Sequence, residues 1–246
     1  VLAQSVPAQA VWYDGRRIVD AKDEDLRKLA AVLGLKPERM IAQMRKDSKR
    51  AFVYLDRQVD SDVAAKAKAL KIPGLGFVTE SKRYYPQGET MAHLVGFTSI
   101  EDKGQEGVEL AFNARLTGED GERNVIRDRL GNVIEDIREL RPPVNGQDLV
   151  LSVDADVQYI VLSELKKAVE LHKAKGAAAV VLDAKTGELL AMANIPTYDP
   201  NNRGQLHGEK LRNRVFTDMF EPGSTLKPFG VALAMDQGKV KASTKI

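Results

Sequence analysis

Residues 221–229 read Glu-Pro-Gly-Ser-Thr-Leu-Lys-Pro-Phe, and this stretch decides how the rest of the chain is interpreted. A Pro-Gly pair precedes Ser224, and the apolar residues after Lys227 predict a helix. Because residues three apart share one face of a helix, the Ser224 hydroxyl and the Lys227 amine would meet if Ser224 opens that helix. The first helical turn also supplies free backbone N–H groups and the positive end of the helix dipole. The spacing fits a nucleophile with its base, and it equally fits an ordinary N-cap serine.

Two other stretches imitate catalytic motifs, and their contexts argue against both. Residues 163–166 repeat the Ser-x-x-Lys spacing, but they lie inside a long amphipathic pattern, where a helix has no free N–H groups. We interpret them as a solvent-facing helix surface. Residues 185–187 read Lys-Thr-Gly between two short apolar runs, where Gly187 suits the left-handed position of a hairpin turn. We interpret this triplet as an exposed turn.

The residues around Ser224 carry a resemblance to a known family. Residues 212–214, Arg-Asn-Arg, together with residues 220–229 closely resemble the active-serine segment of class B penicillin-binding proteins. Members of that family are peptidoglycan D,D-transpeptidases of the bacterial periplasm. The resemblance implies that Ser224 is the catalytic nucleophile and that Lys227 is its base.

The resemblance covers nearly the whole chain and implies its fold class. Residues 71–97 and 104–121 look like the non-catalytic pedestal of the family, and residues 196–202 look like a stretch that precedes its serine. We therefore expect an α+β protein with a pedestal (dimerisation-type) domain over residues 1–145. The N-terminal part of a transpeptidase domain, carrying the Ser-x-x-Lys motif, is expected over residues 146–246. The boundary is placed in the clearest Pro- and Gly-containing breaker of the chain.

The composition fits a soluble globular protein and argues against several classes of function. The chain has 246 residues, enough for two domains, of which 43% are hydrophobic and 29% charged. Its formal net charge of +2 argues against a dedicated nucleic-acid binder. It contains no cysteine, and we expect neither a metal nor a cofactor. No apolar run reaches about 18 residues and the start resembles no signal peptide, so we expect an excised fragment without its membrane anchor.

Hydrophobic periodicity predicts the secondary structure. Helices are expected over residues 23–35, 37–46, 61–70 and 156–173, and strands over residues 51–55, 149–154, 177–182 and 188–193. The last of these helices should bury an apolar stripe made of Val157, Ile160, Val161, Leu165, Ala168 and Val169. Residues 122–138 should form a hairpin that turns at residues 130–132.

Several polar residues are assigned structural roles. Arg83 is expected to form a buried, charge-assisted network with Glu106 and Glu109 rather than a substrate site. His93 is expected to be a packed or hydrogen-bonded histidine, because no spaced partner would complete a metal site. The other two histidines are interpreted in the same way.

The resemblance also implies a reaction and its surroundings. Ser224 would attack the carbonyl between the terminal D-alanines of a peptidoglycan stem peptide, and Lys227 would take its proton. An amine of a second strand would resolve the acyl-enzyme, and β-lactams would acylate the same serine. The family implies the periplasmic face of the bacterial inner membrane, a lipid-linked precursor, a lipid-II glycosyltransferase and other division proteins. Residues 11–14 and 83–86 look more like the septal type than the elongation type.

Two of the three catalytic motifs of the family are missing from the sequence. No Ser-x-Asn occurs in it, and no Lys-Thr-Gly follows Ser224. In the family one oxyanion donor would be the Ser224 N–H and the other would come from the missing strand. We therefore expect the chain alone to be inactive. Two other functions stay open, a β-lactam sensor or serine β-lactamase and a non-catalytic division scaffold.

Overall fold

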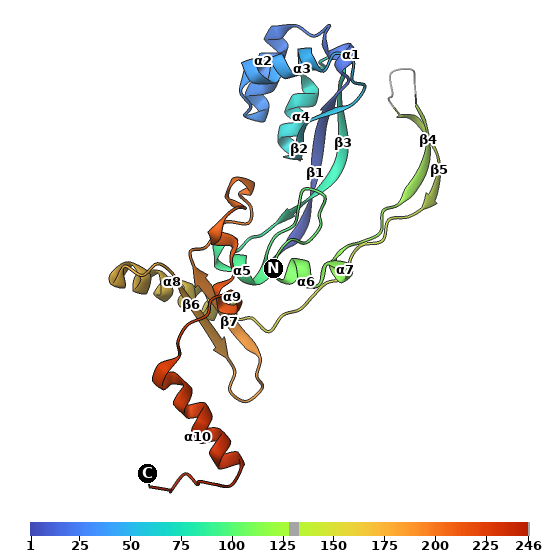
Figure 1. The fold of residues 1–246 in the computed structure, drawn as a ribbon. Coiled ribbons are helices and arrows are strands. Elements are labelled where there is room, and N and C mark those ends of the chain that lie inside the picture. The colour runs from blue at the N-terminus through green and yellow to red at the C-terminus, as the bar shows by residue number, and fades with distance from the viewer. Residues whose placement is uncertain (128–132, 246) are drawn as a thin grey trace.

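The chain folds as an α+β protein with an elongated shape, shown in Figure 1. The structure is a computed structural model, and it describes residues 1–127 and 133–245. One end is a head that comprises residues 4–84, and helix α10 lies at the opposite end (Figure 1). A two-stranded arm, β4 and β5, projects to one side. This arrangement separates the head from the segment that carries Ser224.

The head is built on a three-stranded antiparallel sheet in which β1 (Gln4–Tyr13) is central. The outer strands are β2 (Val53–Asp60) and β3 (Leu75–Tyr84). The β1–β3 register runs without interruption, whereas the β1–β2 register shifts twice. Gln58 lies in the irregular part of β2 with a positive φ of 55°. The predicted strand over residues 51–55 therefore starts slightly later and extends further than expected.

Helices cover one face of this sheet and form the core of the head with it. They are α1 (Gly15–Ile18), α2 (Asp23–Leu33), α3 (Pro37–Lys46) and α4 (Ser61–Ala69). The predictions for the last three are confirmed to within two residues. Helix α2 ends at Gly34, which takes the left-handed conformation with φ 68°. Leu26 and Leu29 of its apolar stripe are fully buried.

Short helical segments connect the head to the rest of the chain. They are η1 (Gly88–Thr90), α5 (Ala92–Val95), α6 (Gly107–Ala111) and α7 (Asn113–Leu116). The chain then enters the arm, where β4 (Glu122–Arg127) pairs antiparallel with β5 (Val133–Arg141). The predicted hairpin is confirmed, and its predicted turn at residues 130–132 lies outside the described residues.

The part of the chain after the arm begins with a helix and a hairpin. Helix α8 (Ala155–His172) packs on β7 (Leu189–Ile195), which pairs antiparallel with β6 (Ala177–Leu182). The prediction of a strand over residues 149–154 is wrong. That segment forms one backbone hydrogen bond with β7, from Asp154 N to Leu190 O at 2.9 Å, and Val150 is 92% exposed. An apolar run becomes a strand only where a neighbour supplies a ladder.

The buried face of α8 is shifted from the one predicted: Val157, Val161, Leu165 and Val169 of the predicted stripe are half-buried, but Ile160 and Ala168 are exposed. Ile160 is 58% exposed, whereas Gln158 and Leu162 are buried. The Gln158 side chain explains the difference, because its amide both donates a hydrogen bond to the backbone of β7 and accepts one from it. Its Nε2 donates to Met192 O at 3.0 Å and its Oε1 accepts from Met192 N at 2.8 Å. A second Nε2 bond reaches Thr90 O at 2.7 Å, so this glutamine ties α8 to both β7 and η1.

The two parts of the chain share a hydrophobic core, which we call the junction core. It contains buried residues on both sides of the arm: Tyr85, Met91, Ala92, Leu94, Val95 and Phe97 before it, and Met192 and Tyr198 after it. Beyond this core the chain forms η2 (Arg203–Gln205), η3 (Glu209–Leu211), α9 (Arg214–Thr217), η4 (Gly223–Leu226) and α10 (Lys227–Asp236). No helix among the described residues is both long and apolar enough to cross a membrane.

A pair of glycines tests how tightly the connecting segments are packed. Gly34 and Gly96 both have positive φ, but a Cβ on Gly34 would meet nothing within 4 Å. A Cβ on Gly96 would lie 1.9 Å from the Glu106 carbonyl oxygen. We expect Gly34→Ala to lower the free energy of unfolding by about 1 kcal/mol, and Gly96→Ala to lower it by at least about 3 kcal/mol. Denaturant unfolding measures both, and equal losses would contradict the packing described.

Candidate active site

The two predicted site residues lie at the junction of a 3₁₀ turn and an α-helix. Ser224 is inside η4, and Lys227 is the first residue of α10. The Lys227 N–H donates to the Ser224 carbonyl oxygen, so one turn spans both residues. Side chains three apart eclipse each other in a 3₁₀ turn, and both therefore leave the same side. Pro228 lies in the first turn of α10, where a missing N–H costs no intrahelical bond.

The entry to this turn is shaped by Gly223, which has a positive φ of 51°. The Thr225 N–H donates to the Pro222 carbonyl oxygen at 3.1 Å, and the Thr225 hydroxyl donates to the same oxygen. Within the part of the chain that the structure describes, neither the Ser224 N–H nor its hydroxyl has a hydrogen-bond partner. An unpaired N–H of this kind is expected in the first turn of a helical segment.

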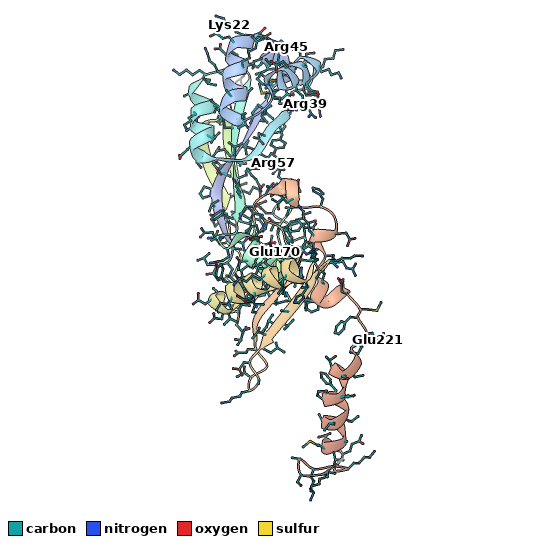
Figure 2. The ribbon with its side chains drawn as sticks, turned by 90° about the vertical axis from the view of Figure 1, so that its left-hand side faces the viewer. Lys22, Arg39, Arg45, Arg57, Glu170 and Glu221 are labelled. Carbon is teal, nitrogen blue, oxygen red and sulfur yellow. The ribbon has the colours of Figure 1, made fainter. Side chains whose placement is uncertain are left out.

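The surroundings of this turn are open. Residues 219–230 are all exposed, and α10 lies clear of the other elements in both views (Figure 1, Figure 2). Its apolar side chains are exposed on more than one face: Phe229 72%, Val231 45%, Leu233 58% and Met235 44%. A helix that is apolar on every side is normally buried. The described residues thus supply the turn, but not the walls that would exclude water from it.

A strap leads from the junction core to the candidate serine, and we define it as residues 196–213. Tyr198 is buried in the junction core, and its hydroxyl donates to Ala92 O at 2.9 Å. Asn201 bonds the backbone of Tyr85 twice, accepting from its N–H at 3.0 Å and donating to its carbonyl at 2.9 Å. These contacts join the strap to residues that precede the arm by more than 20 positions. Sequence reasoning missed them, because asparagines in a polar stretch predict only turns.

The far end of the strap is held by a second amide and a histidine. Asn213 Nδ2 donates to His93 O at 3.3 Å, and its Oδ1 caps α9 by accepting from Val215 N at 3.2 Å. The His93 ring is buried, lies 3.2 Å from Pro196 O through Nε2, and packs edge-on against Tyr198. The expectation of a packed, hydrogen-bonded histidine is confirmed for His93, whereas His172 and His207 are exposed, so the same expectation of packing is wrong for them.

The predicted charge network is confirmed for one of its two acids. Arg83 Nε bonds Glu109 Oε1 at 2.7 Å, and the two side chains are 18% and 4% exposed. Glu106 is exposed, and its carboxylate makes no ion pair among the described residues. The network is partly wrong as predicted, because Glu106 is the cap residue before α6 while Glu109 lies on the inner side of that helix.

Both imitations of catalytic motifs have the structural roles predicted for them. Residues 185–187 lie at the exposed tip of the β6–β7 hairpin, where Gly187 has φ 76° and Asp183 accepts the Lys185 and Thr186 N–H groups. Ser163 lies in the middle of α8, and the half-exposed Lys166 pairs with Glu89. Neither site is placed next to Ser224.

Comparison with known proteins is consistent with this geometry. A family model described as "Penicillin-binding Protein dimerisation domain" matches residues 1–151. A second, "Penicillin binding protein transpeptidase domain", matches residues 177–246. The chain belongs to the penicillin-binding proteins. The division between the two domains at residues 145 and 146 stays a prediction.

The relatives of this penicillin-binding protein chain carry the names of enzymes. The chain is 44% identical to "Peptidoglycan D,D-transpeptidase FtsI" of Escherichia coli K12, over 99% of this chain and 42% of the relative. It is 39% identical to the protein of the same name from Buchnera aphidicola, over 100% of this chain and 44% of the relative. The chain thus spans less than half the length of these curated relatives.

A solved structure supports the fold. The crystal structure of penicillin-binding protein 2X from Streptococcus thermophilus matches with a TM-score of 0.64 and 25% sequence identity. The match covers 99% of this chain and 40% of that chain. The fold of this penicillin-binding protein chain, from the head to the candidate serine, therefore corresponds to one part of that longer chain.

His93 provides a test of how firmly the strap is packed. Burial holds the pKa of its imidazole below the ordinary value; the hydrogen bond to Pro196 opposes this shift, and the charge of Arg214 adds to it. Stability is therefore present above the ordinary His pKa of about 6.5 and is lost as the pH falls through the lower folded pKa. When the pH falls from about 7.5 to about 5.5, the free energy of unfolding should decrease less in His93→Gln than in the wild type.

The control for this experiment is the exposed His207. His207→Gln removes a histidine from an exposed position and therefore controls for the substitution itself. Urea unfolding at several pH values measures all three proteins. Parallel curves for His93→Gln and the wild type would show that His93 is not buried as described.

Proposed function

We propose that this chain is part of a peptidoglycan D,D-transpeptidase that works through an acyl-serine intermediate on Ser224. The observation that carries the proposal is the single 3₁₀ turn that places Ser224 and Lys227 on one side, directly before α10. The family membership and the names of the relatives support it. The substrate class follows from the same names, and it is the stem peptide of peptidoglycan.

The reaction needs two steps, and the turn supplies groups for both. The Ser224 hydroxyl oxygen forms a bond to the carbonyl carbon of the penultimate D-alanine, and its proton passes to a neutral Lys227 amine. The peptide bond breaks, and terminal D-alanine leaves as an amine that takes this proton. The amine of a second stem peptide then attacks the ester carbonyl and loses a proton to Lys227. The bond to the Ser224 oxygen breaks, and this oxygen takes the proton from Lys227 as the cross-link forms. The Ser224 N–H donates to the oxyanion in each step.

The cellular setting is the finer part of the proposal. We propose the septal type of enzyme, on the periplasmic face of the inner membrane, with division proteins and a lipid-II glycosyltransferase as partners. The support is the resemblance of residues 11–14 and 83–86 to septal enzymes and the similarity to proteins named FtsI. β-Lactams are proposed as inhibitors, since they present an acylating carbonyl to the same serine.

Labelling with a penicillin tests the assignment of both site residues. We define the full-length protein as this chain extended to the length of its relatives. It should form one covalent adduct on Ser224, and Ser224→Ala should form none. Lys227→Ala should slow acylation by about 10² to 10⁴-fold, because the general base is lost. The matched controls Ser163→Ala and Lys166→Ala alter the other Ser-x-x-Lys pair and should label at the wild-type rate. An adduct on Ser224→Ala would exclude the proposed nucleophile.

The chain of residues 1–246 by itself provides a second test. We expect it to form no adduct with labelled penicillin, because Ser224, Lys227 and α10 are exposed and no other element of the described residues faces the turn to supply a second oxyanion donor (Figure 1, Figure 2). Loss of one such donor costs about 10²–10³ in rate. Mass spectrometry of the incubated chain measures this. A stoichiometric adduct on Ser224 would contradict the expectation.

A further inference from the structure

A single arginine of the strap connects it to two separate parts of the pedestal. The Arg203 guanidinium donates to Gln58 Oε1 through Nε at 3.2 Å and through Nη2 at 2.6 Å. It also donates to Thr98 O at 3.2 Å through Nη1, and to Ser99 O at 3.2 Å through Nη2. Its partners lie 145, 105 and 104 residues away in the sequence. The guanidinium thus joins β2 of the head, the loop after α5 and the strap.

The head presents Gln58 to this arginine through an irregular backbone. Gln58 has a positive φ, a conformation that side chains other than glycine seldom adopt, and it is 7% exposed. Its backbone N–H donates to the Glu80 carboxylate, and its Nε2 lies 3.4 Å from Ser81 O and 3.5 Å from Ile100 O. These contacts do not involve Arg203, and they hold the Gln58 amide in one orientation. Without Arg203, the buried Oε1 would have no hydrogen-bond donor among the described residues, which is unfavourable.

The strap carries this connection towards the candidate serine. After Arg203, Leu206 and Leu211 pack against the junction core, and Asn213 is bonded to His93 O. The next residues form α9 and then lead to the turn with Ser224. In Figure 2, Arg57, the neighbour of Gln58, lies where the head meets the lower part of the molecule, and Glu221 marks the start of the serine segment. The strap is thus attached to the pedestal at its beginning and at its end.

We propose that Arg203 is a positioning residue, which fixes the strap to Gln58 of the pedestal and thereby sets the position of Ser224 for acylation. This inference rests on the proposed function. A displacement of about 1 Å in a reacting group is enough to slow a reaction strongly, so a loose strap should reduce acylation without altering the chemistry. The pedestal is then a working part of the serine scaffold as well as a spacer.

The four hydrogen bonds of the Arg203 guanidinium, which we call the clamp, require an arginine side chain. Four hydrogen bonds reach three acceptors that lie in different directions, and only the planar fork of guanidinium donors can meet them together. A lysine would keep the positive charge, but all of its N–H donors lie on one nitrogen atom. Because Arg203 is itself exposed, its replacement should leave both hydrophobic cores intact. The effect should appear in the order of the strap and in the acylation rate more than in global stability.

The experiment compares Arg203→Ala, Gln58→Ala, the double variant and Arg203→Lys in the full-length protein. Acylation by labelled penicillin should slow about tenfold in each single variant. The double variant should be no slower than either single variant, because both remove the same connection. Arg203→Lys should recover only part of the rate. Hydrogen exchange should be faster at the strap amides of Gln205 and Leu206, which are bonded within the strap.

Arg45→Ala is the matched control. Arg45 also donates to several backbone carbonyls and one side chain, Ile18 O, Val19 O, Ala21 O and Asp23, but all of them lie within the head. Figure 2 shows Arg45 near the far end of the head. This variant should lose stability of the head, yet acylate at the wild-type rate and leave strap exchange unchanged.

The outcomes separate the clamp from the proposed function. Unchanged strap exchange in Arg203→Ala would overturn the clamp itself. Faster exchange with wild-type acylation would overturn the positioning role, as would rate losses that multiply in the double variant or an equal loss in Arg45→Ala. If the wild-type protein forms no adduct on Ser224, the proposed function fails and the positioning role fails with it, while the exchange data still decide whether the clamp exists.

Discussion

The junction core is the interaction on which the rest of this structure depends. Tyr85, Met91 and Phe97 come from the pedestal side, and Met192 and Tyr198 come from the transpeptidase side. Burying these side chains is favourable only when both segments are present, because each covers apolar surface of the other. The arm lies between these two groups of residues in the sequence, so residues about 100 positions apart pack in the same core. The two family regions are consequently packed together rather than joined by a flexible linker.

Side-chain amides complete what the apolar contacts begin. Gln158, Asn201 and Asn213 each bond backbone groups of a different segment. An amide carries both a donor and an acceptor, and it can therefore replace a missing backbone partner where two irregular segments meet. Buried backbone groups need such partners, since an unmade hydrogen bond is costly. The strap has little regular structure, and these amides explain how it is nevertheless held in one place.

Local patterns predicted most of the regular elements, and tertiary contacts account for the failures. Helices α2, α3 and α4 were predicted because periodicity and terminal residues lie within each segment. The segment 149–154 has the composition of a strand, but β7 meets it at one backbone bond and forms its ladder with β6 instead. The predicted buried face of α8 was only partly right, since hydrophobicity favours burial of Ile160, whereas the hydrogen bonds of Gln158 hold Gln158 inside instead. No single-sequence pattern contains the position of β7 that decides this.

The candidate site shows the same division at the level of chemistry. The Ser224–Lys227 spacing is a local property, because the dihedral angles of one turn fix it, and the sequence predicted it from nine residues. Reactivity is not local, since a lysine becomes a base only where water is excluded and positive charge or desolvation disfavours its proton. Here α10 is exposed around its circumference, and the strap behind it is bonded to residues far earlier in the chain. A motif of this kind therefore predicts which serine is the nucleophile, whereas the reactivity of that serine depends on groups far from it in the sequence, which the motif does not contain.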